Sequence, residues 1–235
     1  MVRRSGSRFD FWLCLAVFLS MAAALMMTFL WAPKEQTMGD VQRIFYFHVP
    51  AGMAGMAAFA INFVASLLYL IRKDLKWDRL ALAAAEVGVV FIAILLAFGM
   101  IWAKYAWYVW WTWSPRLTVS LILWMLYVAY LLLRNYVPEP VRRATVAAVF
   151  GVIAFVDVPV VWFSIRWWRD IHPQAMLEAG GLAPSMRPTL WLCAVAFFLL
   201  LAYVLRRRYF LETARDDITW LARRADEVGM ERNLR

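Results

Sequence analysis

The chain contains two histidines, each placed where an imidazole could reach a metal at the edge of an apolar segment. His48 lies two residues before Pro50, a residue suited to start a helix. His172 precedes Pro173, which favours extended backbone and lets the ring project from a loop. Between them, residues 102–118 (WAKYAWYVWWTWSPRLT) carry five tryptophans in their first twelve positions. Because a flat apolar macrocycle whose iron takes two axial imidazoles needs aromatic walls, these residues predict heme binding.

Each feature has a simpler explanation when it is taken alone. Tryptophan and tyrosine are enriched at membrane interfaces, so an aromatic belt accounts for one or two rings at each segment end. A single histidine at an interface is more often a hydrogen-bonded surface residue than a metal ligand. Zinc is a weaker alternative to heme, since two histidines would need further ligands. The candidate carboxylates, at no recognisable ligand spacing, are Glu35, Asp40, Asp170 and Glu178.

Basic residues near these segments could pair with the two propionates of heme. Arginine binds a carboxylate through two parallel hydrogen bonds. Basic side chains near a membrane surface also extend toward the headgroups without any ligand, so the choice among them stays open. The candidates close in sequence to the tryptophans or to His172 are Lys104, Arg116, Arg166 and Arg169.

The composition places these residues in a membrane protein. The 235 residues are 64% hydrophobic and 17% charged, with a mean hydropathy of +0.63, whereas soluble domains carry about 25% charged residues. A bilayer is crossed by roughly 20 apolar residues, and the first apolar run is too long for a cleaved signal sequence. We therefore predict an all-α protein, a bundle of six transmembrane helices, with apolar runs at about 11–32, 49–71, 80–103, 117–133, 144–163 and 189–205.

The distribution of Lys and Arg predicts the orientation of the bundle. Eighteen lie on the side that holds both termini and seven on the other, so both termini are expected in the cytoplasm. The loops near 33–48, 104–116 and 164–188 then face outward, and both histidines and the tryptophans share that face. We expect a heme-handling domain over residues 1–205. Residues 206–235 would be a cytoplasmic tail, either a short helix on the membrane surface or a solvated segment.

Several residues inside the apolar runs carry further expectations. Ionisable side chains at such depth face the bundle interior or a partner, which leaves proton relay and helix-to-helix hydrogen bonding open for Glu86 and Asp157. Pro159 can kink the fifth segment. The small residues in 51–58 indicate a close helix contact, internal or with another subunit. The two cysteines lie in apolar runs and offer no disulfide framework or redox pair.

Three segments of the chain resemble a known family. Residues 107–118 resemble the tryptophan-rich WWD signature of heme-handling membrane proteins. Residues 43–50 (RIFYFHVP) and 158–172 (VPVVWFSIRWWRDIH) resemble the two histidine-bearing segments of the heme exporter protein C (CcmC) family of bacterial cytochrome c maturation. Related heme-lyase subunits share the signature but are longer, with more spans. Two positions depart from the pattern: Tyr108 stands where glycine is usual, and Ser114 replaces the signature aspartate, which removes a carboxylate from the platform.

The resemblance implies a bacterial inner-membrane protein that holds heme b transiently at its periplasmic face. It implies delivery to the heme chaperone CcmE, in a complex with the ABC-type subunits CcmA and CcmB and the small subunit CcmD. Any covalent attachment of heme would occur on a partner and no GxxxxGK[ST] motif is present, so we expect no enzymatic activity here. The implied axial ligands are His48 and His172, and the implied platform residues are Trp107, Trp110, Trp111, Trp113, Arg116 and Thr118.

Two other functions are compatible with the sequence. The first is a b-type electron-transfer subunit that exchanges electrons with quinone through a permanently bound heme. Such proteins usually bury their histidine ligands within helices. The second is a structural transporter subunit that binds no cofactor and uses its tryptophans only as an interface anchor. Retention or transfer of the heme would separate the first from a carrier, and heme absorbance after purification would exclude the second.

Overall fold

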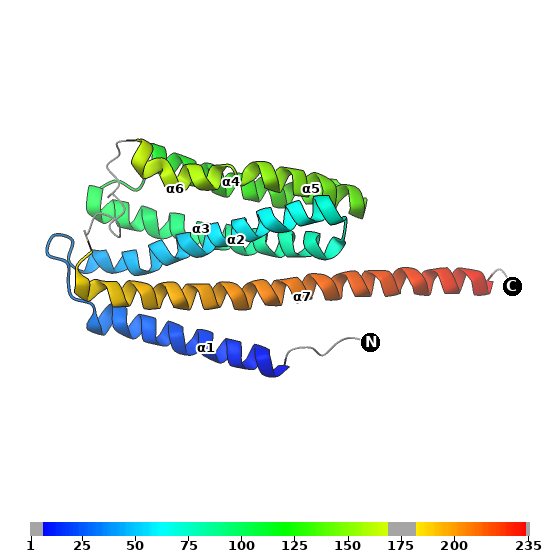
Figure 1. The fold of residues 1–235 in the computed structure, drawn as a ribbon, viewed down its shortest axis with the longest axis horizontal. Coiled ribbons are helices and arrows are strands. Elements are labelled where there is room, and N and C mark those ends of the chain that lie inside the picture. The colour runs from blue at the N-terminus through cyan, green and yellow to red at the C-terminus, as the bar shows by residue number, and fades with distance from the viewer. Residues whose placement is uncertain (1–6, 169–181, 234–235) are drawn as a thin grey trace.

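A computed structural model describes residues 7–168 and 182–233 of the chain (Figure 1). Within that part, six segments are long and apolar enough to cross a membrane, which confirms the predicted bundle of six transmembrane helices. The fifth segment consists of two helices, α5 and α6, in line. The helices are α1 (Ser7–Met26), α2 (Phe45–Arg72), α3 (Leu75–Trp107), α4 (Pro115–Tyr136), α5 (Pro140–Ala154), α6 (Asp157–Trp167) and α7 (Arg187–Asn233), with short turns η1 (Met27–Trp31), η2 (Asp40–Ile44) and η3 (Pro184–Met186).

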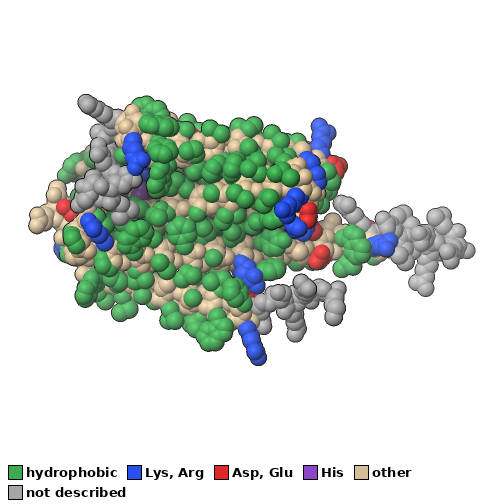
Figure 2. All heavy atoms as spheres, in the orientation of Figure 1, with side chains coloured by type: hydrophobic (Ala, Val, Ile, Leu, Met, Phe, Trp, Pro, Cys, Tyr) green, Lys and Arg blue, Asp and Glu red, His purple; other side chains and the backbone are tan. Residues whose placement is uncertain are grey.

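The helices lie side by side along one axis, with α2 and α3 in the middle of the bundle (Figure 1). Helices α4, α5 and α6 form one flank, and α7 with α1 forms the other. Residues 32–39 and 108–114 lie at one end of the bundle, which we call the loop end, and residues 73–74 and 137–139 lie at the other, the termini end. The described residues of the three loops that the charge distribution predicts to face outward therefore gather at one end. Apolar side chains cover the flank between the two ends (Figure 2).

The small residues of 51–58 form the contact between α2 and α3, so the close contact predicted from them is internal. A Cβ atom on Gly52 would lie 2.3 Å from Cδ1 of Leu95, and one on Gly55 would lie 2.6 Å from Cδ1 of Ile92. A side chain at Gly52 would displace the end of the Leu95 side chain, and one at Gly55 would press on both the side chain and the backbone nitrogen of Ile92. The two helices pack here as one unit.

Helix α2 begins earlier than Pro50, contrary to the expectation that this proline starts it. The helix starts at Phe45, and Pro50 is its sixth residue. The preceding turn is helical because the Tyr46 side chain is fully buried against α7 residues such as Leu190. Burial of that ring outweighs the one intrahelical hydrogen bond that a proline lacks. His48 consequently sits in the first turn of a helix rather than in a loop.

Near Pro159 the structure shows a two-residue interruption between α5 and α6, and these two residues keep α-region backbone angles. Proline has no N–H to donate to the Phe155 carbonyl four residues earlier, and Val158 N donates to that oxygen instead, at 3.0 Å. Below the break, α5 packs against α2, with the rings of Phe63 and Phe155 stacked at 4.4 Å between centroids. Above the break, α6 packs against α4. Contact with α2 thus comes mainly from α5, and contact with α4 from both helices.

The two acids of the apolar runs have different surroundings. Glu86 accepts two hydrogen bonds from Arg208 of α7, at 2.6 and 2.7 Å, so it joins two helices. Asp157 begins α6, and its Oδ2 is buried without a hydrogen-bond partner among the described residues. A second ion pair, Asp78 with Arg134, is buried between α3 and α4 and is also held by two hydrogen bonds, at 2.6 and 2.7 Å.

Helix α7 continues without interruption through the segment expected to form a tail. Arg206 pairs with Asp10 of α1 at 2.6 Å, and Asp216 still pairs with Arg79 of α3 at 3.0 Å. Beyond Asp216 the helix extends clear of the other helices (Figure 1). Residues 206–233 are therefore a direct extension of the sixth span.

Candidate functional site

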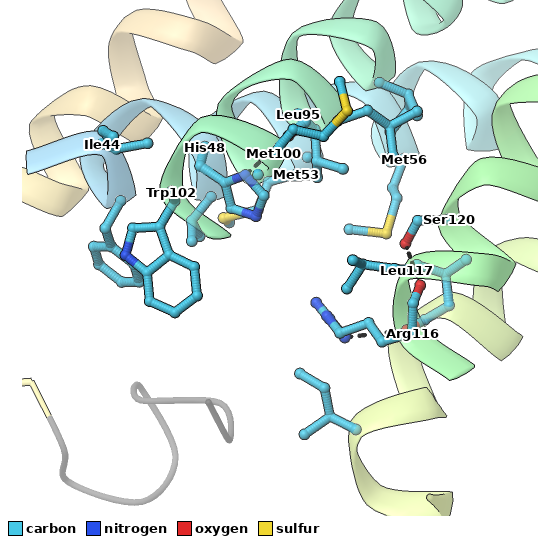
Figure 3. A pocket seen from close by; sticks show the side chains of 18 of the residues that line it. Ile44, His48, Met53, Met56, Leu95, Met100, Trp102, Arg116, Leu117 and Ser120 are labelled. Atoms are coloured by element: carbon cyan, nitrogen blue, oxygen red, sulfur yellow. Dashed lines mark hydrogen bonds between the residues drawn. The ribbon is translucent and has the colours of Figure 1, made fainter. Parts of the chain in front are cut away.

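A cavity of about 650 Å³ lies at the loop end between α2, α3, α4 and α6 (Figure 3). It extends from His48 to Met56 along α2, which at 1.5 Å per residue is about 12 Å into the bundle. The cavity is apolar in its depth and polar toward the loop end. The deep side chains include Met53, Met56, Ile92, Leu96 and Leu123, and the polar ones nearer the loops include Gln42, His48, Arg116 and Arg166.

The imidazole of His48 is held in one orientation at the cavity wall. Its Nδ1 lies 3.0 Å from the carbonyl oxygen of Leu95. Because a carbonyl only accepts, Nδ1 carries the hydrogen and donates it, which leaves the lone pair on Nε2. A Cβ on Gly99 would lie 3.1 Å from Cε1 of His48, so the glycine makes room for the ring. In Figure 3 the ring points into the cavity beside the indole of Trp102.

The tryptophans of residues 102–118 divide into two groups. Trp102, Trp107 and Trp111 line the cavity, and the rings of Trp102 and Trp107 meet edge to face at 4.9 Å between centroids. Trp110 and Trp113 are 57% and 76% exposed and lie outside the cavity lining. The platform positions implied by the resemblance therefore include both cavity and outer-surface residues.

Arg116 reaches the cavity from the first turn of α4. Its Nη1 donates to the Val161 carbonyl at 3.3 Å and lies 3.4 Å from Oγ of Ser164, both on α6. Its guanidinium extends toward the space in front of His48 (Figure 3). Thr118 lies on the same helix outside the cavity lining, and its N–H donates to the Ser114 carbonyl at 2.9 Å. Positive charge is thus concentrated at the polar mouth.

The remaining candidate residues, proposed as propionate partners or metal ligands, lie in different places. Arg166 lines the cavity, and Lys104 lies over the ring of Trp110 at 5.9 Å from its centroid. Within the described part of the chain, no group of three or more His, Cys, Asp or Glu could hold a metal ion. The candidates that lie outside the described residues are His172, Arg169, Asp170 and Glu178.

The two positions that depart from the family pattern are both helix caps. Tyr108 ends α3 with φ 62° and ψ 11°, the left-handed conformation that glycine adopts without steric cost. Ser114 is the N-cap of α4, followed by Pro115 at the first helical position. Serine and aspartate are both favoured N-caps. Oγ of Ser114 is buried without a hydrogen-bond partner among the described residues.

Sequence reasoning missed Leu95 and Gly99, the residues that orient His48. Their signal is helical spacing, because Leu95, Gly99 and Trp102 are four and three residues apart and share one face of α3. That spacing does not reveal which histidine they face.

Comparison with known proteins gives one family. A family model described as heme exporter protein C (CcmC) matches residues 2–224. The heme exporter protein C of Bradyrhizobium diazoefficiens is 33% identical over 192 residues, which cover 80% of this chain and 73% of the relative. That of Escherichia coli K12 is 32% identical over 192 residues, covering 81% and 78%. A putative cytochrome c biosynthesis ccmC-like mitochondrial protein of Marchantia polymorpha is 29% identical over 181 residues, covering 76% and 77%.

Proposed function

The chain belongs to the heme exporter protein C family, and we propose that it binds heme b in the cavity at its loop end and passes the heme on during cytochrome c maturation. The family is a membrane component for heme export and not a family of catalytic enzymes. Binding, orientation and release are therefore the steps that this chain would perform.

One observation carries the proposal: His48 faces an apolar cavity with its lone pair on Nε2 while Nδ1 is fixed by a backbone carbonyl. Ligating histidines in metalloproteins almost always donate their other N–H in this way. The volume of about 650 Å³ lies in the range of small-molecule sites. Heme brings an iron with two axial positions and two carboxylates on one edge.

Each group of the cavity has a role toward that ligand. His48 would supply one axial ligand, and the family resemblance assigns the second to His172. Trp107 and Trp111 would contact the porphyrin face as aromatic walls. Arg116 would hold a propionate at the polar mouth, because guanidinium and carboxylate form charge-assisted hydrogen bonds.

We further propose that the loop end is periplasmic and the termini end cytoplasmic, in a bacterial inner membrane. The excess of Lys and Arg on the side of the termini supports this orientation. The heme would pass to the chaperone CcmE at the loop end. CcmA, CcmB and CcmD would be the partner subunits, and any ATP-driven step would belong to a partner.

Absorption and resonance Raman spectra of the purified protein test the ligands. His48→Ala and His172→Ala should each give five-coordinate iron, and the double variant should lose its heme. Circular dichroism checks that each variant is folded. An unchanged heme spectrum in the double variant would contradict the proposal.

The position of His48 inside α2 favours one second candidate, a b-type electron-transfer subunit, since such proteins bury their ligands in helices. Incubation with quinol and with purified apo-chaperone distinguishes the two. A carrier should lose its heme to the chaperone, whereas a cytochrome should be reduced by quinol and retain its heme.

A further inference from the structure

The four helices around the cavity do not all pack against their neighbours. Helix α3 packs against α4, and α4 packs against α6, which closes two sides. Among the described residues, no comparable contact joins α6 to α2. Along this segment α5 packs on both α2 and α4, whereas α6 packs on α4. The side of the cavity between α2 and α6 is therefore the one without helix packing.

The residues on this side are apolar and reach the surface. Met53 and Met56 line the cavity from α2, and Trp162 and Ile165 line it from α6. Trp162 is also 53% exposed, so it borders both the cavity and the outside of the bundle.

This opening lies at the depth of the membrane. Met53 is five residues beyond His48 along α2, which is about 8 Å farther from the loop end. All four rim residues belong to segments long and apolar enough to span a bilayer. The polar lining residues, by contrast, lie toward the loop end. The opening between α2 and α6 therefore faces acyl chains, whereas the mouth at the loop end faces headgroups and water.

We propose that heme enters the cavity sideways from the bilayer, through the opening between α2 and α6. The inference rests on the proposed function. A porphyrin is flat and apolar with both carboxylates on one edge, so it dissolves in a leaflet with that edge at the headgroups. In this orientation the ring passes between Met53 and Trp162 while the carboxylates stay level with Arg116 and Arg166. The macrocycle reaches His48 without crossing water.

A cross-link across the opening tests the route. Met53→Cys and Trp162→Cys are combined in a Cys14→Ala background, since Cys14 is exposed and Cys193 is buried. Bis-maleimides of graded length then bridge α2 and α6 in proteoliposomes. Heme is supplied from phosphatidylcholine vesicles that contain phosphatidylglycerol, and loading is followed by Soret absorbance. The cross-link should slow loading at least tenfold, whereas heme loaded before cross-linking should keep its spectrum.

The reference is the double-cysteine variant without reagent, and the two single-cysteine variants treated with the same reagents measure the effect of an attached maleimide alone; the slowing in the cross-linked protein should exceed the sum of theirs. A second pair, Met56→Cys with Ile165→Cys, provides the same test if the first pair does not fold. Unchanged loading in a cross-linked pair would overturn the lateral route. Failure of the proposed function looks different, because the untreated protein would then take up no heme at all.

Discussion

Gly99→Ala should weaken heme binding without destabilising the protein. The added Cβ would lie 3.1 Å from Cε1 of His48, closer than an ordinary contact of 3.4–4 Å, so the ring must move by a few tenths of an ångström. That movement strains the 3.0 Å hydrogen bond from Nδ1 to the Leu95 carbonyl. Disturbing such outer partners typically costs about 10- to 100-fold in metal affinity, or about 1.4–2.8 kcal/mol.

Gly99→Ala should raise the stability of the fold while it lowers heme affinity, so a loss of affinity cannot be attributed to unfolding. Alanine favours a helix interior over glycine by about 1 kcal/mol, so thermal unfolding of the heme-free protein should not begin earlier. Heme affinity is measured by Soret titration of Gly99→Ala in the native and His48→Ala backgrounds. The effect should vanish in the His48→Ala background. An equal loss of affinity in both backgrounds, or no loss in the native one, would refute the reasoning.

Three further predictions concern stability and pH. Tyr108→Gly should raise the free energy of unfolding by about 1 kcal/mol, seen as a higher midpoint in thermal unfolding; a lower midpoint would show that the left-handed cap carries no strain. Asp78→Asn should cost about 3–5 kcal/mol in detergent unfolding because Arg134 loses its buried counter-charge, and Asp78→Leu with Arg134→Met should recover most of it. Acidification to about pH 5 should release heme, since protons compete with iron for imidazole; a constant Soret band would argue against histidine ligation.

The six membrane spans, and the end of the bundle at which the loops gather, could be predicted because a bilayer imposes one strong requirement on the chain. Each crossing needs a long apolar segment, and the runs that meet it are visible without any knowledge of packing. The break at Pro159 and the α2–α3 contact follow from the covalent structure of proline and from the absence of side chains at Gly52 and Gly55. The predicted start of α2 at Pro50 was wrong because the helix is extended by the burial of Tyr46, which is a tertiary effect.

The site was harder to predict because its geometry depends on neighbouring helices. His48, Trp107 and Arg116 were candidates on residue type, and they line the cavity. Residue type does not tell which indoles turn inward, and Trp110 lies on the outer surface although it stands beside Trp111 in the sequence. The roles of Leu95 and Gly99 depend on the rotation of α3 against α2, which no local pattern specifies. The pairing of His48 with His172 stays a prediction.

The glycine-mediated packing of α2 on α3 has a mechanical consequence. His48 belongs to α2 and Trp102 to α3, and these two helices pack closely at Gly52 and Gly55. The spacing between imidazole and indole is then preserved in every rearrangement that leaves this pair intact. Adjustment to an arriving or departing ligand falls to the opposite wall, where α6 follows α5 after the two-residue turn at 155–156 and packs on α4. The wall formed by α2 and α3 thus stays fixed, and the wall formed by α6 is the one that moves when a ligand enters or leaves.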